Sequence, residues 1–274
     1  MRIPLLTAAV LLAAVTAFAH GPAQPPLKSP AAAALRKGDL ETALTLFESE
    51  IKASPDEPRL KQHYAELKTH LRREKMFAAE QNPEMKTRIG RQLRRFYYKC
   101  GMFGKAEQTD RAVYAADASE ANAVSLGVTL LNTGKNQEAA ELFRKVNLDK
   151  AKPGVVLCAA LAEARTGSKE NSVKLLSRFS VEKMDANSLQ LYARCAALNG
   201  DAAGTAAAVR RILEQTKAKQ HPSLKKHLFS TPDFRNVAEQ ESFKAALNTE
   251  SKVKDNCDTC PKRGTAECED NQKH

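Results

Sequence analysis

The side chains best suited to chemistry gather at the C-terminal end of the chain. Two cysteines lie three positions apart in the segment CDTCP, and a third cysteine and a histidine follow; the four are Cys257, Cys260, Cys268 and His274. Four such ligands suit a tetrahedral zinc ion. The same Cys-x-x-Cys spacing occurs in thiol redox proteins, although the βαβ pattern that accompanies it there is absent here. A disulfide is the third use, and six cysteines allow too many pairings for the sequence to assign one.

The other three cysteines, Cys100, Cys158 and Cys195, lie in segments rich in apolar residues with helical spacing. A buried cysteine behaves as a small hydrophobic side chain. We therefore expect these three to be buried free thiols.

A second candidate site is the segment KTRIGRQLRRFYYKC, in which Arg88, Arg91 and Arg95 share one face of a helix. The apolar residues recur on the other face; they are Ile89, Leu93, Phe96, Tyr97 and Cys100. Guanidinium groups bind carboxylates through two parallel hydrogen bonds. The three arginines therefore predict a site for an acidic segment or a C-terminal carboxylate, which Arg165 and Arg194 extend. A purely solubilising role is the alternative reading of such a charged face.

The formal net charge of +11 suits acidic partners in general. Nucleic acid is the competing partner class, but Phe96, Tyr97 and Tyr98 fall on or beside the apolar face instead of among the arginines. We expect protein or peptide partners and no nucleic acid.

The sequence contains no catalytic signature, since it has no phosphate-binding glycine loop, helical metalloprotease motif or nucleophile elbow. Its carboxylates, such as Glu138 and Glu141, lie among lysines at helical spacing, a pattern typical of solvated surface. We therefore expect a protein without catalysis and without a cofactor, apart from zinc at the C-terminal cysteines.

A periodic glycine determines the expected architecture. Gly101, Gly134, Gly167 and Gly200 follow one another at intervals of 33 residues, and each separates two helical apolar patterns. Glycine closes a helix in the left-handed conformation without a Cβ penalty. The segment LRKGDLETALTLFESEIKASPDEP, with Gly38 at its turn, follows the same pattern.

These residues resemble the tetratricopeptide repeat family. The resemblance rests on Leu126, Gly127, Gly134, Ala139 and Phe143 in one unit, on Gly38, Ala43, Phe47 and Pro55 in another, and on Gly101 with Ala106 in a third. The resemblance covers roughly residues 30–55 and 84–217. The units of Gly167 and Gly200 keep the 33-residue spacing but fewer of the residues typical of the family. The tryptophan usual in the family is missing. The resemblance implies an all-α solenoid, a right-handed superhelix of antiparallel helix pairs whose concave groove holds a protein or peptide.

The N-terminal residues predict export. An apolar run ends in Ala17-Phe18-Ala19, the small-x-small pattern of signal-peptidase sites, so we expect a periplasmic or extracellular protein without membrane insertion after cleavage. Export favours a disulfide over zinc among the C-terminal cysteines. The alternative function is a zinc- or thiol-dependent accessory protein that acts through those cysteines.

The expected organisation is a signal peptide (1–19), a proline-rich tether (20–30), helical repeats (31–217), capping helices (218–250) and a flexible cysteine-containing tail (251–274). Residues 56–84 are helical but lack a turn glycine, so they form either one long helix or a decayed repeat. A further helix is expected to start at Ser230-Thr231-Pro232-Asp233, which combines a capping residue with proline.

Overall fold

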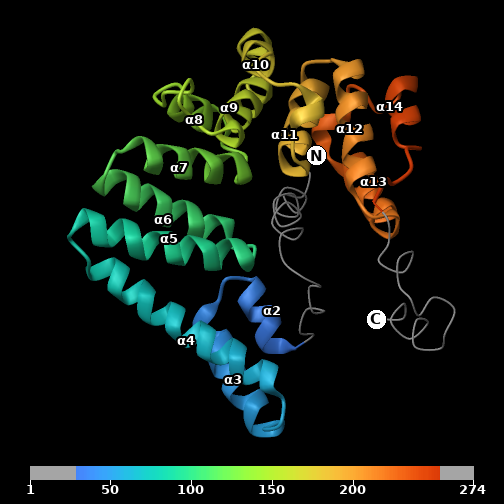
Figure 1. Ribbon diagram of the computed structural model, residues 1–274. Helices are drawn as coiled ribbons and strands as arrows, with labels where there is room; N and C mark the ends of the chain where they lie inside the picture. The colour runs from blue at the N-terminus through green and yellow to red at the C-terminus, as the bar shows by residue number, and fades with distance from the viewer. Residues whose placement is uncertain (1–28, 254–274) are drawn as a thin grey trace, which may run out of the picture. The chain divides into compact units, whose positions relative to one another are not determined.

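The computed structural model describes residues 29–253, and every regular element in this range is helical (Figure 1). The all-α class expected from the sequence is therefore confirmed. The chain divides into two compact units, the first ending at Ala151 and the second beginning at Lys152. We call their described parts unit 1 and unit 2.

Each unit is built from helices that pack on their neighbours along the chain. Unit 1 contains α2 (Pro30–Arg36), α3 (Leu40–Ala53), α4 (Pro58–Ala79), α5 (Pro83–Lys99), α6 (Phe103–Ala116), α7 (Glu120–Asn132) and α8 (Asn136–Phe143). Unit 2 contains α9 (Pro153–Arg165), α10 (Lys169–Leu176), α11 (Ala186–Leu198), α12 (Ala202–Gln215), α13 (His221–Ser230) and α14 (Glu241–Ala246). Three single turns of 3₁₀ helix complete unit 2: η2 (Val181–Lys183), η3 (Ala218–Gln220) and η4 (Pro232–Phe234).

One turn geometry recurs five times between paired helices. Gly38, Gly101, Gly134, Gly167 and Gly200 all have a positive φ, between 73° and 84°. In each turn the glycine N–H donates to the carbonyl three residues back, and the next N–H donates to the carbonyl five residues back. At Gly167 these bonds reach Ala164 O at 3.2 Å and, from Ser168, Glu163 O at 2.9 Å. This is the Schellman helix end, so the left-handed role predicted for the periodic glycines is confirmed.

Replacing one of these glycines tests how strongly the turn depends on the residue type. Nothing lies within 4 Å of a Cβ built on Gly167, so Gly167→Ala meets only the backbone penalty of the left-handed region. We expect the free energy of unfolding, measured by urea titration, to fall by about 1–2 kcal/mol. Gly154→Ala is the matched control, because Gly154 lies in the first turn of α9 with equally open surroundings. The control should raise stability by up to about 1 kcal/mol, and equal effects of the two substitutions would contradict the turn argument.

The second helices α3 and α8 bury the small and large residues that the sequence pattern singled out. In α3, Ala43 and Phe47 are both 0% exposed, and in α8, Ala139 and Phe143 are at most 1% exposed. A Cβ built on Gly127 of α7 would lie 2.9 Å from the Phe143 ring. Close approach of α7 and α8 therefore depends on the absence of a side chain at residue 127.

Residues 56–84, which the sequence left open between one long helix and a decayed repeat, consist mainly of one long helix, α4, of 22 residues. Pro55 lies in the turn before it, and Glu57 caps it. His70 of α4 is 8% exposed and stacks on Phe96 of α5 with ring centroids 3.7 Å apart. Burial lowers the pKa of His70 to about 4, so this ring is uncharged at neutral pH.

The helix start predicted at residues 230–233 begins only a single turn of 3₁₀ helix and no longer helix. α13 ends at Ser230, and Pro232–Phe234 form only the single turn η4. The next helix, α14, begins at Glu241. Asp233 of η4 accepts hydrogen bonds from arginine side chains of α9 and α11, as described below.

Candidate functional site

α5 carries the arginine face and is a well-defined amphipathic helix. The side chain of Asn82 accepts a hydrogen bond from Met85 N at 3.0 Å, and Pro83 occupies the first helical position. The predicted apolar face is buried, since Ile89, Leu93, Phe96 and Tyr97 are each at most 6% exposed and only Cys100 is half-buried. Burial of this face fixes which side of α5 the arginines occupy.

Arg88, Arg91 and Arg95 are all exposed, and none has an ion-pair partner among the described residues. The three line an open hollow of about 1010 Å³ that runs along α5 and reaches the last residue of α6. Because α5 ends at the Gly101 turn, it is the first helix of its pair. Three unpaired guanidinium groups beside an open volume can bind carboxylate or phosphate oxygens from solution.

Carboxylates also border this hollow, and their partners differ. Asp117 is engaged, because its oxygens accept from Ser119 Oγ at 2.9 Å and from Asn122 Nδ2 at 2.8 Å. Glu80 accepts from Asn82 N at 2.9 Å. Glu84 is exposed and has no ion-pair partner within residues 29–253. Among the described residues, the charged side chains of the hollow without a hydrogen bond or ion pair are therefore the three arginines and Glu84.

Thr87 forms part of the wall between Glu84 and Arg88. Thr87 is 8% exposed, and its hydroxyl has no hydrogen-bond partner among the described residues. An unsatisfied buried hydroxyl is unfavourable in the free protein. Sequence reasoning missed this residue, because threonine within a charged helix carries no distinguishing signal.

A chain of hydrogen bonds holds the C-terminal half of α5 against α6 and α7. Asn132 Nδ2 donates to the Tyr98 hydroxyl at 3.0 Å, which lies 2.7 Å from Thr129 Oγ1. Thr129 Oγ1 in turn donates to Asp110 Oδ2 at 2.6 Å. Arg94 lies 3.9 Å from the same oxygen and over the Tyr98 ring. Burial raises the pKa of Asp110 although Thr129 and Arg94 oppose the shift. These contacts fix the rotation of α5 and hence the direction of its arginine face.

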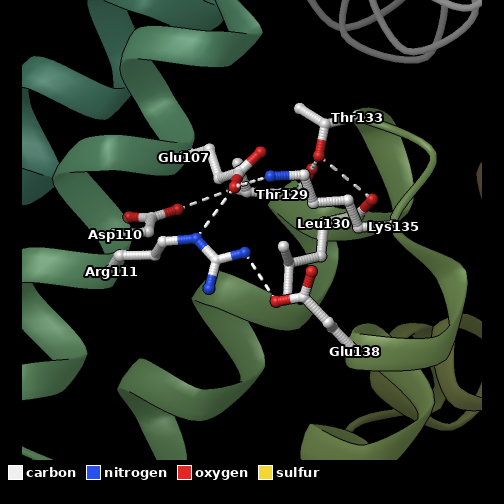
Figure 2. A network of polar contacts seen from close by, with 8 residues as sticks. All are labelled: Glu107, Asp110, Arg111, Thr129, Leu130, Thr133, Lys135 and Glu138. Atoms are coloured by element: carbon white, nitrogen blue, oxygen red, sulfur yellow. Dashed lines mark hydrogen bonds and ion pairs between the residues drawn. The ribbon is translucent and has the colours of Figure 1, made fainter.

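A second polar network continues from α6 to the start of α8 (Figure 2). Glu107 is 7% exposed and accepts from Arg111 Nε at 2.8 Å and from Lys135 Nζ at 2.5 Å. Burial raises the pKa of Glu107, but the hydrogen bonds from Lys135 and Arg111 outweigh it and hold the pKa below its usual value. Arg111 also binds Glu138 at 2.6 Å. Glu138 is thus half-exposed and ion-paired to another helix, whereas the sequence indicated only solvated surface.

The expectation that Arg165 and Arg194 extend the arginine surface needs correction. Both bind Asp233 inside unit 2: Arg194 Nε donates to Asp233 Oδ2 at 2.7 Å, and Arg165 Nη2 donates to the same oxygen at 3.0 Å. Arg194 is 6% exposed and Asp233 is 6% exposed. Burial raises the pKa of Asp233, but the two arginines outweigh it and hold that pKa below its usual value. Arg194 therefore stabilises unit 2 and is not accessible to a partner.

The cysteines of the helical repeats are free, as expected, but only Cys195 is buried as predicted, whereas Cys100 and Cys158 are half-buried. Burial raises the pKa of the Cys100 and Cys158 thiols to about 11 in each case, so neither is a thiolate at neutral pH. The predicted disulfide or zinc ligands Cys257, Cys260, Cys268 and His274 lie outside the described residues. Within residues 29–253, no three side chains of metal-ligating type converge.

None of the helices in the described range combines the length and the apolar composition needed to span a membrane. Comparison with known proteins adds no relative. The chain matches no family model, and no curated protein matches it.

Proposed function

We propose that this protein is a tetratricopeptide-like scaffold that binds an acidic protein segment at the hollow along α5 and catalyses no reaction. The observation that carries the proposal is the set of three exposed arginines, Arg88, Arg91 and Arg95, which border an open volume without ion-pair partners in the described chain. A docking site needs such a volume beside its charged groups.

The solenoid arrangement is part of this proposal. Its support is the five-fold recurrence of one helix, one left-handed glycine and a second helix, at Gly38, Gly101, Gly134, Gly167 and Gly200. Equivalent turns with equivalent buried residues suit a regular stack of helix pairs, in which each pair packs on its neighbours. Such stacks offer extended surfaces that suit peptide recognition.

Export to the periplasm or the cell exterior is proposed as well, on the strength of the N-terminal apolar run and its Ala17-Phe18-Ala19 ending. The partner is then a protein of the same compartment. Buried thiols such as Cys195 are compatible with an oxidising compartment, because burial protects them from reagents.

The test removes the three positive charges of α5 together, as Arg88→Gln, Arg91→Gln and Arg95→Gln. Crosslinked affinity capture from the exported fraction should recover the specific partner at least about tenfold less efficiently with this variant, a loss that corresponds to about 1.4 kcal/mol. Capture by the parent protein should also weaken at several hundred millimolar salt, because exposed charges are then screened.

A matched control is available on α4, where Lys68, Arg72 and Lys75 are exposed and border a second hollow of about 470 Å³. Changing these three to glutamine removes the same charge and should leave capture unchanged. Equal losses in both triple variants would show that general positive charge attracts the partner. Unchanged capture by the α5 variant, with its helical circular dichroism intact, would refute the proposed function.

A further inference from the structure

The charges of the α5 hollow change sign along the helix. Glu84, Arg88, Arg91 and Arg95 are spaced by four, three and four residues, so they form one stripe on one face. Glu84 lies at the N-terminal end of that stripe, and the arginines follow it. The surface is therefore negative at one end and positive along the rest.

The negative end is available for binding. Glutamate followed four residues later by arginine on a helix commonly forms an ion pair. Glu84 and Arg88 form none, and Glu84 is exposed without another ion-pair partner in the described chain. The two other carboxylates that border the hollow, Glu80 and Asp117, accept hydrogen bonds from neighbouring residues. Glu84 is thus the carboxylate of the hollow whose oxygens have no hydrogen-bond or ion-pair partner among the described residues.

We infer that the hollow binds an extended peptide segment of mixed charge, with acidic residues opposite the arginines and one basic residue opposite Glu84. This inference rests on the proposed function and specifies its ligand. The rise of about 1.5 Å per helical residue places Arg91 about 10.5 Å and Arg95 about 16.5 Å from Glu84 along the axis. An extended peptide advances about 3.3 Å per residue. The basic residue therefore lies about three to five positions from the acidic ones.

A uniformly negative ligand fits this stripe less well. A nucleic acid or a wholly acidic peptide that extends past Arg88 would bring negative charge against Glu84. Like charges at close range oppose binding, and such repulsion selects among ligands. The sign change along α5 thus favours a mixed-charge peptide over a polyanion.

The test uses synthetic peptides and the full chain, with binding followed by fluorescence anisotropy at low salt. Two peptides each carry two glutamates separated by one residue. In one peptide a lysine lies three positions before the first glutamate, and in the other it lies three positions after the second. Two matched control peptides carry glutamine in place of that lysine. The two lysine peptides correspond to the two directions in which the chain can lie along α5. We expect one of them to bind at least about threefold more tightly than its matched glutamine peptide. This gain would run against the overall attraction, because lysine lowers the negative charge offered to a basic protein.

Glu84→Gln should remove the gain from lysine while leaving the glutamine peptides bound at least as well as before. The control is Glu170→Gln, because Glu170 is an exposed glutamate in the first turn of another helix, α10. Glu170→Gln should leave the gain intact. A single-stranded oligonucleotide should bind the parent weakly and bind Glu84→Gln more tightly.

The inference is overturned if lysine brings no gain at either position, or if the gain survives Glu84→Gln. A different result decides the proposed function, namely the response of the peptides to Arg91→Gln. If the glutamine peptides bind and lose affinity when Arg91 is changed to glutamine, the acidic-segment site stands even when the charge-reversal inference falls. If no peptide responds to Arg91→Gln, the site itself is refuted.

Discussion

Asp233→Asn should lower the free energy of unfolding by about 3–5 kcal/mol, as expected when one partner of a buried ion pair is removed. Arg194 is 6% exposed and donates to Asp233 Oδ2 at 2.7 Å, so the substitution leaves a guanidinium charge inside unit 2 without its counter-charge. Arg165 loses the same counter-charge, but it is less deeply buried. The contacts of η4 with α9 and α11 should weaken together. Urea unfolding followed by circular dichroism would measure the loss.

Two variants make this result interpretable. Glu239→Gln breaks an ion pair between Glu239 and Lys244 at 3.1 Å, but Glu239 is 91% exposed, and the unfolding midpoint should not change measurably. Arg194→Met combined with Asp233→Asn removes the uncompensated charge, and it should recover part of the stability that Asp233→Asn loses. A double variant less stable than Asp233→Asn alone, or an unchanged midpoint for Asp233→Asn, would contradict the role assigned to the pair.

Phe143→Ala should destabilise the protein by about 3–5 kcal/mol, the usual range for truncating a buried aromatic ring. Phe143 is 1% exposed, and its ring fills the space beside Gly127 in α7. The cost combines the apolar area lost from the core with the cavity that remains. Val173→Ala is a suitable control, because Val173 is 46% exposed and should contribute little.

The contact between α7 and α8 makes a sharper prediction for a pair of substitutions. Gly127→Ala alone should cost about 1–3 kcal/mol, because its methyl group would lie 2.9 Å from the Phe143 ring. In the Phe143→Ala background the ring is gone, so the same methyl group should enter the vacated space at a smaller cost. A double-mutant cycle of unfolding free energies measures this coupling. Additive costs would show that close approach at Gly127 is not what the glycine provides.

Much of the local structure could be predicted from the sequence because it depends on neighbours along the chain. A left-handed turn needs glycine, and all five predicted turns form at Gly38, Gly101, Gly134, Gly167 and Gly200. The apolar face of α5 could be predicted for the same reason, since a spacing of three and four residues places side chains on one side of a helix. The exposed positions of Arg88, Arg91 and Arg95 follow directly from that face.

Long-range pairing could not be predicted in this way. Asp233 resembled a helix-capping residue, and Arg194 resembled a surface charge, because their contact joins residues 39 positions apart. Glu138 likewise was predicted to lie on solvated surface, but the packing of α6 beside α8 brings Arg111 to it. Charge type alone does not indicate whether a side chain faces water or a partner on another helix.

The sequence by itself determined the all-α class, the ends of the paired helices and the face of α5 that carries the arginines, because each depends on backbone preferences and helical periodicity within a few residues. Only the tertiary structure decided which charged residues remain unpaired. Arg194 is neutralised in the interior by Asp233, whereas Arg88, Arg91, Arg95 and Glu84 border an open hollow. That difference depends on which helices pack together, since burial of a charge is tolerated only where packing brings a counter-charge to it.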